Sequence, residues 1–337
     1  MNQEKVTALE NKINTDYSNI AGIVVRKDGQ TLYENYFNEC TAANRIHVYS
    51  VSKSIISILI GIALDKGHIS SIHQKVLDFF PAYTVKKREK RIQNITLKDL
   101  LTMTAPYKYK FEPYTYIRYF MSDDWLRFTL DLLGGKGQIG EFRYTPLVGP
   151  DILSGILVKA TGQSVFDFAT ENLFSPLGIT VESNVVLHSA KEQSAFNQSK
   201  SISGWVIDSA GINAGGWGLT LAPLDMAKIG QLCLDAGMWN GKQIVSASWI
   251  EESTKEHSRW QKINLPYGYL WWIIDDKEHA CAAMGDGGNV IYFNTKKKIV
   301  VSIASLFVQN AKDRIELIKD YIEPIVADST LQNLPIY

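Results

Sequence analysis

Ser50 and Lys53 stand three positions apart at the start of a long apolar segment that ends near Leu64. Residues i and i+3 share one face of a helix, so the hydroxyl and the amine can meet if this segment is helical. Burial favours the neutral form of a lysine, and a neutral amine can take the proton of a serine hydroxyl and leave a nucleophile. The spacing therefore predicts a nucleophilic serine with a lysine base. The alternative is coincidence, which the apolar segment and the absence of a second Ser-x-x-Lys in the chain make weaker.

A serine nucleophile also needs a group that relays protons, and the tyrosines are the candidates. Tyr144 follows a glycine-rich loop, residues 134–137, and precedes a segment with a helical pattern. A neighbouring ammonium favours the ionised form of a tyrosine, which suits it to proton transfer. The competing interpretation is that Tyr144 packs in the core, and Tyr107 or Tyr109 is then the fallback for the relay.

The third requirement is an oxyanion hole, which two backbone N–H groups can form. The N–H of Ser50 is one candidate, because the first N–H groups of a helix have no partner within it. The glycine-rich stretch Gly285, Asp286, Gly287, Gly288 and Asn289, between two predicted strands, can supply the other. An ordinary hairpin turn would explain the same glycines.

Strand patterns at both ends of the chain indicate one antiparallel sheet. Two β-rich runs flank Asp28 and Gly29, a strong hairpin signal. A lone hairpin is unstable, so we expect it to join the strands predicted at 267–274, 280–284, 290–293 and 299–304. Helices are expected at 2–16, 50–66, 222–236, 246–254 and 311–326. The predicted fold class is α+β, an antiparallel β-sheet flanked by helices with an inserted, mainly helical region.

In the middle of the chain, segments with a helical pattern alternate with loops rich in proline and glycine. Helices are expected at 95–104, 151–160 and 164–173, and residues 181–204 are polar and patternless, which indicates an extended or mobile loop. Residues 107–120 are rich in aromatic side chains, which either pack in the core or, as the family resemblance described below implies, border a cleft. The predicted domains are an α/β sheet domain, residues 1–69 with 205–337, and an inserted helical domain, residues 70–204.

Composition excludes several functional classes. The 337 residues include 35 Lys or Arg and 35 Asp or Glu, so the formal net charge is zero and nucleic acid is not an expected partner. The three cysteines, Cys40, Cys233 and Cys281, have neither disulfide nor metal-site spacing, and we expect no metal or cofactor. No apolar run is long enough to span a bilayer, and no signal peptide is visible, so a cytoplasmic location is expected. The oligomeric state stays open.

The chain resembles the serine β-lactamase-like family, which contains class C β-lactamases, DD-peptidases and related esterases. Ser50-Val51-Ser52-Lys53 looks like its Ser-x-x-Lys element, and Tyr144 lies where its Tyr-x-Asn motif stands. Further matching segments, in the family's order, are residues 95–104, 154–162, 176–178, 214–216, 267–272 and 285–288. The resemblance implies an acyl-enzyme on Ser50, proton transfer by Lys53 and Tyr144, and an oxyanion held by the N–H groups of Ser50 and Asn289.

Two departures from the family pattern narrow the expected substrate. Pro146 stands where an asparagine that binds the substrate amide is expected, and Asp286 stands where a cation is expected. An aspartate repels the carboxylate of a β-lactam or a peptide. We therefore expect a serine hydrolase for small esters or amides. The alternatives are a ligand-binding or regulatory homologue without turnover, and a true β-lactamase or DD-peptidase.

Overall fold

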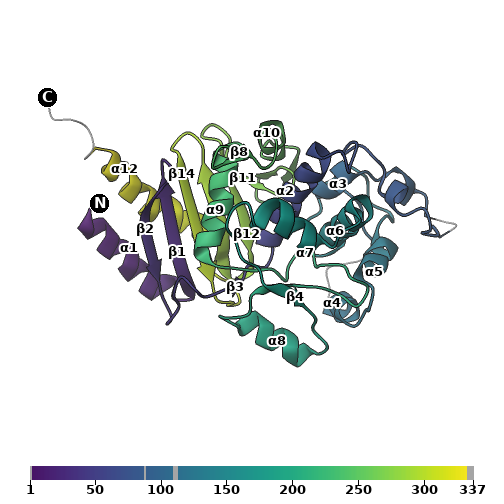
Figure 1. Cartoon of the computed structure of the whole chain (residues 1–337), viewed down its shortest axis with the longest axis horizontal. Coiled ribbons are helices and arrows are strands. Elements are labelled where there is room, and N and C mark those ends of the chain that lie inside the picture. Colours follow the sequence, from purple (N-terminus) through teal and green to yellow (C-terminus); the bar gives the residue numbers. More distant parts are fainter. Residues whose placement is uncertain (1, 87–88, 109–112, 332–337) are drawn as a thin grey trace.

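One antiparallel sheet of eight strands forms the centre of the molecule (Figure 1), and both ends of the chain contribute to it. The computed structural model describes residues 2–86, 89–108 and 113–331. The strand order is β2-β1-β14-β13-β12-β11-β10-β9. Their bounds are β1 Ile20–Lys27, β2 Gln30–Tyr36, β9 Ser258–Trp260, β10 Leu265–Tyr267, β11 Trp272–Asp275, β12 Ala280–Gly285, β13 Asn289–Asn294 and β14 Ile299–Ser305. The predicted union of the N-terminal hairpin with the C-terminal strands is confirmed.

Both faces of this sheet are buried. Along β13, Val290 and Tyr292 pack into one apolar cluster, while Ile291 and Phe293 pack into the other. Because side chains of a strand alternate between faces, a strand buried on both sides is apolar throughout. This explains why β13 and β14 read as continuous apolar runs rather than as alternating patterns.

Helices from the two chain ends cover one face, and two long helices cover the other (Figure 1). The first group comprises α1 (Gln3–Asp16), α11 (Arg314–Leu317) and α12 (Glu323–Leu331), the last two joined through a π-helical turn at Ile318–Ile322. The second group comprises α2 (Val51–Asp65) and α9 (Pro223–Leu234). Residues 51–63 of α2 are all buried, which confirms the predicted buried helix.

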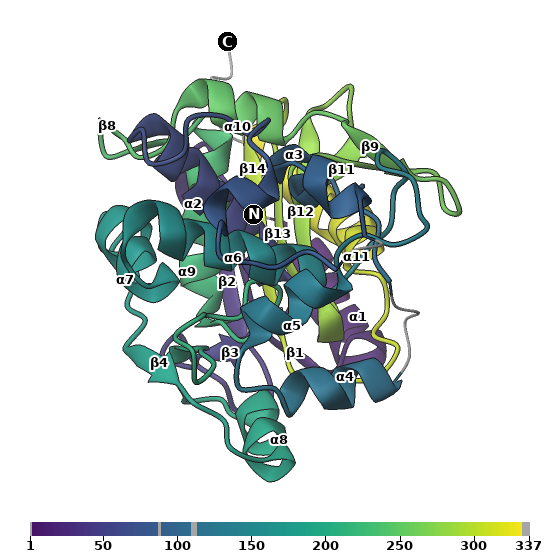
Figure 2. The same cartoon turned by 90° about the vertical axis from the view of Figure 1, so that its right-hand side faces the viewer.

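The middle of the chain forms a layer of helices beside α2 (Figure 2). Their bounds are α3 Leu97–Leu101, α4 Pro113–Phe120, α5 Trp125–Leu132, α6 Val148–Thr161 and α7 Val165–Ala169, with a π-helical turn at Thr170–Phe174. Thr96 caps α3 as predicted: its hydroxyl accepts from the N–H of Asp99, and the Asp99 carboxylate accepts from the N–H of Thr96. Shorter elements complete the fold: β3 Ile46–His47, β6 Thr220–Leu221, β7 Met238–Trp239, β8 Lys242–Gln243 and α10 Ala247–Ser253.

Two predicted elements are wrong. Residues 181–204 are not an unstructured loop, because they contain β4 (Ser183–Val185) and α8 (Ala190–Gln198) and lead into β5 (Gly204–Val206). The strand predicted at 267–274 is broken after Tyr267, where the Gly268 N–H bonds to the Trp271 carbonyl and Leu270 adopts a left-handed backbone. Leu270 instead donates its N–H to Leu101 of α3.

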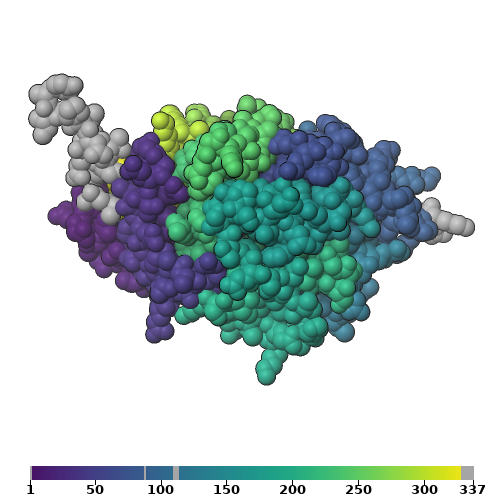
Figure 3. Space-filling view, viewed as in Figure 1, coloured from purple at the N-terminus to yellow at the C-terminus, as the bar shows by residue number. Residues whose placement is uncertain are grey.

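The sheet and the helical layer pack as one body on the face seen in Figure 3, where residues of the early and late chain lie side by side. The proposed division into two domains stays a prediction. Among the described residues, no helix is long and apolar enough to cross a membrane.

Candidate active site

Ser50 lies at the N-terminus of α2 and contacts Lys53 one turn further on. The Lys53 Nζ atom donates to Ser50 Oγ at 2.6 Å, and the Lys53 side chain is only 2% exposed. A serine at this position normally caps its helix by accepting from a backbone N–H. The Ser50 side chain makes no such bond, so its oxygen faces the amine instead. The contact predicted from the i, i+3 spacing is present.

The residue before the serine sets the direction of the chain. Tyr49 has a backbone φ of 49°, a left-handed conformation that costs a non-glycine residue about 1–2 kcal/mol. Its ring stacks on the His47 imidazole at 3.8 Å and contacts the Phe307 ring at 5.4 Å. These contacts hold a sharp turn between β3 and α2, and the turn leaves Ser50 half-buried at the start of the helix.

His47 fixes the strand side of this turn. Its Nε2 atom accepts from the N–H of Gly218 at 2.8 Å, and Nδ1 lies 3.0 Å from the side-chain oxygen of Asn197 on α8. Burial lowers the pKa of His47 to about 3, so the ring is neutral at physiological pH. With Nε2 as an acceptor, the proton sits on Nδ1 and donates to Asn197. His47 thereby ties β3 and α8 to the segment that follows Gly216.

Tyr144 lies beside the lysine. The Lys53 Nζ atom is 5.2 Å from the centre of the Tyr144 ring, which stacks on Trp272 of β11 at 5.7 Å. Of the fallback tyrosines, Tyr107 is buried with its hydroxyl against Gly149 of α6. Tyr109 lies outside the described residues. The structure thus brings Ser50, Lys53 and Tyr144 together.

The second hydrogen-bond acceptor for Lys53 is a backbone carbonyl. Lys53 Nζ donates to the Gly216 oxygen at 3.2 Å. Pro146, which has no side-chain polar group, packs its own carbonyl against Gly216, where an added Cβ atom would lie 1.9 Å from that oxygen. Glycine is therefore required at 216, and the position occupied by Pro146 supplies packing rather than a side-chain hydrogen bond.

The turn at residues 285–288 approaches Ser50 from the sheet. A Cβ atom added to Gly285 would lie 3.1 Å from the Ser50 nitrogen and 2.2 Å from the Val48 oxygen. Asp286 is exposed, and its charge raises the pKa of Tyr49 further after burial of that phenol. Asn289 is fully buried. The predicted oxyanion stretch therefore meets Ser50 through Gly285, and Asp286 follows it directly.

The Asn289 side chain is part of the scaffold of this turn. Its amide nitrogen donates to the carbonyl of Asp286 at 2.8 Å and to that of His47 at 3.4 Å. Its oxygen accepts from the N–H of Ser305 at 2.9 Å. These bonds join the turn to β3 and β14, so the side chain holds the position of Asp286.

A buried cation supports the same turn from behind. Asn19 donates to the Gly287 carbonyl at 2.7 Å, and Arg314 donates to Asn19 at 2.6 Å and to Gly287 at 3.4 Å. A Cβ atom on Gly288 would lie 2.7 Å from the Arg314 guanidinium. Burial lowers the pKa of Arg314 to about 10, so it stays charged at neutral pH.

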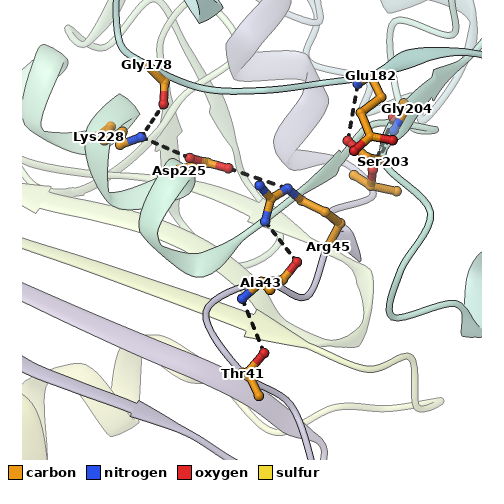
Figure 4. A network of polar contacts seen from close by, with 10 residues as sticks. Thr41, Ala43, Arg45, Gly178, Glu182, Ser203, Gly204, Asp225 and Lys228 are labelled. Atoms are coloured by element: carbon orange, nitrogen blue, oxygen red, sulfur yellow. Dashed lines mark hydrogen bonds and ion pairs between the residues drawn. The ribbon is translucent and has the colours of Figure 1, made fainter.

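An acidic residue of α9 anchors the segment that leads toward Ser50 (Figure 4). Asp225 lies between Lys228, 3.2 Å from its nearer oxygen, and Arg45, 3.8 Å away. Arg45 also donates to the carbonyl of Ala43. Because Arg45 directly precedes β3, this network connects the approach to the nucleophile with the helix that covers the sheet.

A cavity of about 600 Å³ opens beside Trp217, the residue after Gly216. Its apolar lining comes from Ile117, Phe120, Met121, Trp125, Val186 and Trp217. Met121 is 79% exposed, which is unusual for an apolar side chain, and the Phe120 ring meets the Trp217 ring at 5.2 Å. Pockets of this size and polarity commonly hold small organic ligands. Of the aromatic-rich stretch predicted to border a cleft, Phe120 lines this cavity.

Within the described ranges, no group of three His, Cys, Asp or Glu side chains is arranged to hold a metal ion. The three cysteines of the chain are free and buried.

Comparison with known proteins identifies the relatives of the chain. The family described as Beta-lactamase matches residues 14–321. The 6-aminohexanoate-dimer hydrolase of Paenarthrobacter ureafaciens is 21% identical over 305 residues, which cover 84% of this chain and 71% of that protein.

Solved structures share the fold at low identity. A penicillin-binding protein homologue from Caulobacter crescentus matches with a TM-score of 0.74 and 13% identity, over 96% of this chain and 97% of that one. A family VIII carboxylesterase matches with a TM-score of 0.70 and 16% identity, over 95% of this chain and 96% of that one. The fold is that of β-lactamase-like proteins, as the resemblance implied.

Proposed function

Because the chain belongs to the Beta-lactamase family, we propose that it is a serine hydrolase that cleaves small esters or amides through an acyl-enzyme on Ser50. The observation that carries the proposal is the 2.6 Å contact between Lys53 Nζ and Ser50 Oγ at the N-terminus of a buried helix. A carboxylesterase and an amide-dimer hydrolase are among its relatives.

The reaction we propose has two halves. Lys53 takes the hydroxyl proton while Ser50 Oγ forms a bond to the substrate carbonyl carbon. The bond to the alcohol or amine then breaks, and that group leaves with a proton delivered by Lys53 through Tyr144. Water then attacks the acyl carbon and gives a proton to Lys53 through Tyr144. The bond to Ser50 Oγ breaks, and Lys53 returns that proton to the serine as the acid leaves. General acid–base catalysis of this kind contributes about 10²- to 10⁴-fold.

For the oxyanion we assign the N–H groups of Ser50 and Asp286. The N–H of Ser50 lies at the positive end of the α2 dipole, which favours developing negative charge. Gly285 lies against that nitrogen, and Asp286 follows it directly at the exposed edge of the turn. Asn289, the partner that the resemblance implied, is fully buried and holds the Asp286 carbonyl. It therefore fits a supporting role better than contact with substrate.

The charge of Asp286 affects which substrates we expect the site to accept. Its exposed carboxylate beside the turn disfavours acids and favours neutral esters or compounds with an amine. A linear dimer of 6-aminohexanoate contains an amide, a free amine at one end and a carboxylate at the other, and a relative takes its name from that compound. Only its amine end suits a position beside Asp286. Amine-bearing amides are therefore our second substrate class, after neutral esters with an apolar group for the cavity beside Trp217.

The competing function is ligand binding without turnover. The observation that favours it is Pro146, which provides no side-chain donor for a substrate amide. It predicts an acyl group that stays on Ser50 or a ligand that binds independently of Ser50. Hydrolysis of β-lactams or DD-peptides is the third candidate, and Asp286 argues against it.

The decisive experiment is covalent labelling with a fluorophosphonate, followed by intact-mass spectrometry and peptide mapping. We expect one adduct on Ser50 in the wild type and none in Ser50→Ala. Ser52→Ala is the matched control, since Ser52 Oγ donates to the Tyr49 carbonyl and takes no part in the proposed chemistry. Labelling that persists in Ser50→Ala, or no labelling of the wild type, would refute the proposal.

Turnover separates the three candidates. We expect p-nitrophenyl butyrate to be hydrolysed with a kcat/KM at least about tenfold above that for a chromogenic cephalosporin, because like charges in contact disfavour the cephalosporin carboxylate. A stoichiometric burst without further release would support the binding protein. Faster cephalosporin hydrolysis would support a β-lactamase.

A further inference from the structure

Helix α6 carries a carboxyl group that is completely buried behind the candidate active site. Asp151 is 0% exposed, although an ionisable side chain is rarely buried unless it has partners. Its Oδ2 atom accepts from the Tyr119 hydroxyl at 2.7 Å, and its Oδ1 atom accepts from the N–H of Gly215 at 2.8 Å. Tyr119 in turn accepts from the Trp217 indole at 3.2 Å.

The backbone that Asp151 holds is the one that contacts Lys53. Gly215 is followed by Gly216, whose carbonyl accepts from Lys53 Nζ at 3.2 Å. Neither glycine has room for a side chain: an added Cβ atom at Gly215 would lie 2.2 Å from the Pro150 oxygen. The backbone torsions of two glycines separate the Gly215 N–H from the Gly216 oxygen, and close packing of both residues against the carbonyls of Pro150 and Pro146 restricts those torsions. A bond to the Gly215 N–H therefore helps to fix where the Gly216 oxygen points.

We propose that Asp151 is a positioning residue for Lys53, which acts through the Gly215–Gly216 backbone to aim the amine at Ser50. The proposal rests on the proposed function, because positioning of a base has no meaning without the acyl transfer. Asp151 itself touches neither substrate nor Ser50.

The buried surroundings of Asp151 also change the pH at which its carboxyl group ionises. Burial raises the pKa of Asp151 to about 7, against the opposing influence of its bonds to Tyr119 and Gly215 and of the Lys53 charge. The charged and titratable groups that face it are Lys53 from α2, Tyr119 from α4 and Asp208 from the segment after β5. Asp151 therefore changes charge near neutral pH. The ionised carboxylate accepts the Gly215 N–H more strongly than the neutral acid does, so its hold on the Gly215–Gly216 backbone changes over the same pH range.

Two substitutions separate these effects. Asp151→Leu removes the acceptor for the Gly215 N–H, and Asp151→Asn keeps an acceptor but cannot ionise. We expect Asp151→Leu to lower kcat for p-nitrophenyl butyrate about 10- to 100-fold with KM changed less than about threefold, because a small misplacement of a catalytic group has effects of this size. We expect Asp151→Asn to keep kcat within about fivefold and to lose an inflection near pH 7 that the wild type shows.

Asp208→Asn is the matched control. Asp208 is also a buried acid, burial also raises its pKa, and it accepts from the N–H groups of Trp125 and Ile212. None of its hydrogen bonds reaches Gly215 or Gly216. Loss of the inflection in Asp208→Asn as well, or its survival in Asp151→Asn, would overturn the proposal.

Failure of this inference is distinguishable from failure of the proposed function. If the wild type forms no adduct with the fluorophosphonate, the function itself is wrong. If the wild type and a folded Asp151→Leu label at the same rate, only the positioning role is wrong. Should Asp151→Leu not fold, the pH profile of Asp151→Asn alone decides.

Discussion

Single residues in this chain carry roles that their neighbours make possible. The Ser50 hydroxyl does not cap its own helix, because Tyr49 turns the chain and Lys53 engages the oxygen. This arrangement suits the proposed role of Ser50 as nucleophile. We propose that Asp286 affects specificity, since its exposed charge stands one residue from the glycine that meets the Ser50 backbone.

Reversal of that charge tests its part. We expect Asp286→Lys to raise kcat/KM at least about tenfold for a p-nitrophenyl ester whose acyl chain carries a carboxylate. For p-nitrophenyl butyrate, which carries no charge, we expect kcat/KM to change less than about threefold. Steady-state kinetics at low and high salt measure both. Asp276→Lys, an exposed aspartate between β11 and β12, makes the same charge change at the other end of β12. An equal gain in that control would remove Asp286 from substrate selection.

For single residues, sequence spacing predicts contacts between side chains that lie close together in the chain. Ser50 and Lys53 could be predicted because three positions in a helix define their distance. Asp151 could not, because its partners are the backbone of Gly215 and a tyrosine of another helix, and no local pattern marks them. The role of His47 could not be predicted for the same reason, since it depends on Gly218 and Asn197.

Among the elements, the meeting of α2 with the turn between β12 and β13 defines the candidate site. The helix presents its N-terminus, and the turn brings the Gly285 backbone against it. Asn289 and Arg314 hold the turn through its carbonyls at Asp286 and Gly287. The geometry therefore depends on backbone packing that tolerates no added atoms.

A methyl group at this contact should separate activity from stability. We expect Gly285→Ala to lower the rate of Ser50 labelling at least about 100-fold, because the added Cβ would displace the turn from the Ser50 N–H by a large fraction of an ångström. Gly268→Ala is the control, since its Cβ would also lie 2.2 Å from a carbonyl oxygen, that of Ser253. Thermal unfolding should show both destabilised. Equal labelling rates in the two folded variants would contradict this account of the turn.

The elements that could be predicted are those with strong local signals. The hairpin at Asp28 and Gly29 and the cap of α3 at Thr96 are examples. The break after Tyr267 could not be foreseen, because bonds from Leu270 to Leu101 and from Ser54 to Leu270 impose it from distant parts of the chain. Helix α8 was missed since only its Phe196 is buried, which gives no apolar periodicity.

At the scale of the whole molecule, we expect the free energy of unfolding to depend on pH through His47. His47 bonds to segments far apart in the chain and is held neutral by burial, with a pKa near 3 against 6.5 for a free histidine. Between those values the unfolded chain binds a proton that the folded protein does not. The stabilisation that depends on neutral His47 is therefore complete above pH 6.5. Below that pH the free energy of unfolding falls by up to about 1.4 kcal/mol per pH unit.

We expect the free energy of unfolding of the wild type, relative to His47→Gln, to fall as pH decreases from 6.5 to 4. Glutamine can still accept from the Gly218 N–H and does not titrate. The comparison cancels Asp151, whose raised pKa acts in the opposite direction over the same range. Urea titrations at each pH measure the difference, with the exposed His73→Gln as control. A constant difference would show that His47 is protonated without unfolding.

The order of the strands has a consequence for synthesis. β1 is among the first segments to leave the ribosome, yet one of its two neighbours in the sheet is β14, made near the end. Ser50 and Lys53 likewise emerge long before the turn at 285–288 that meets them. A nascent chain thus carries the proposed nucleophile and its own N–H without the second proposed oxyanion group, the N–H of Asp286. The proposed site is therefore complete only when nearly the whole chain has been translated.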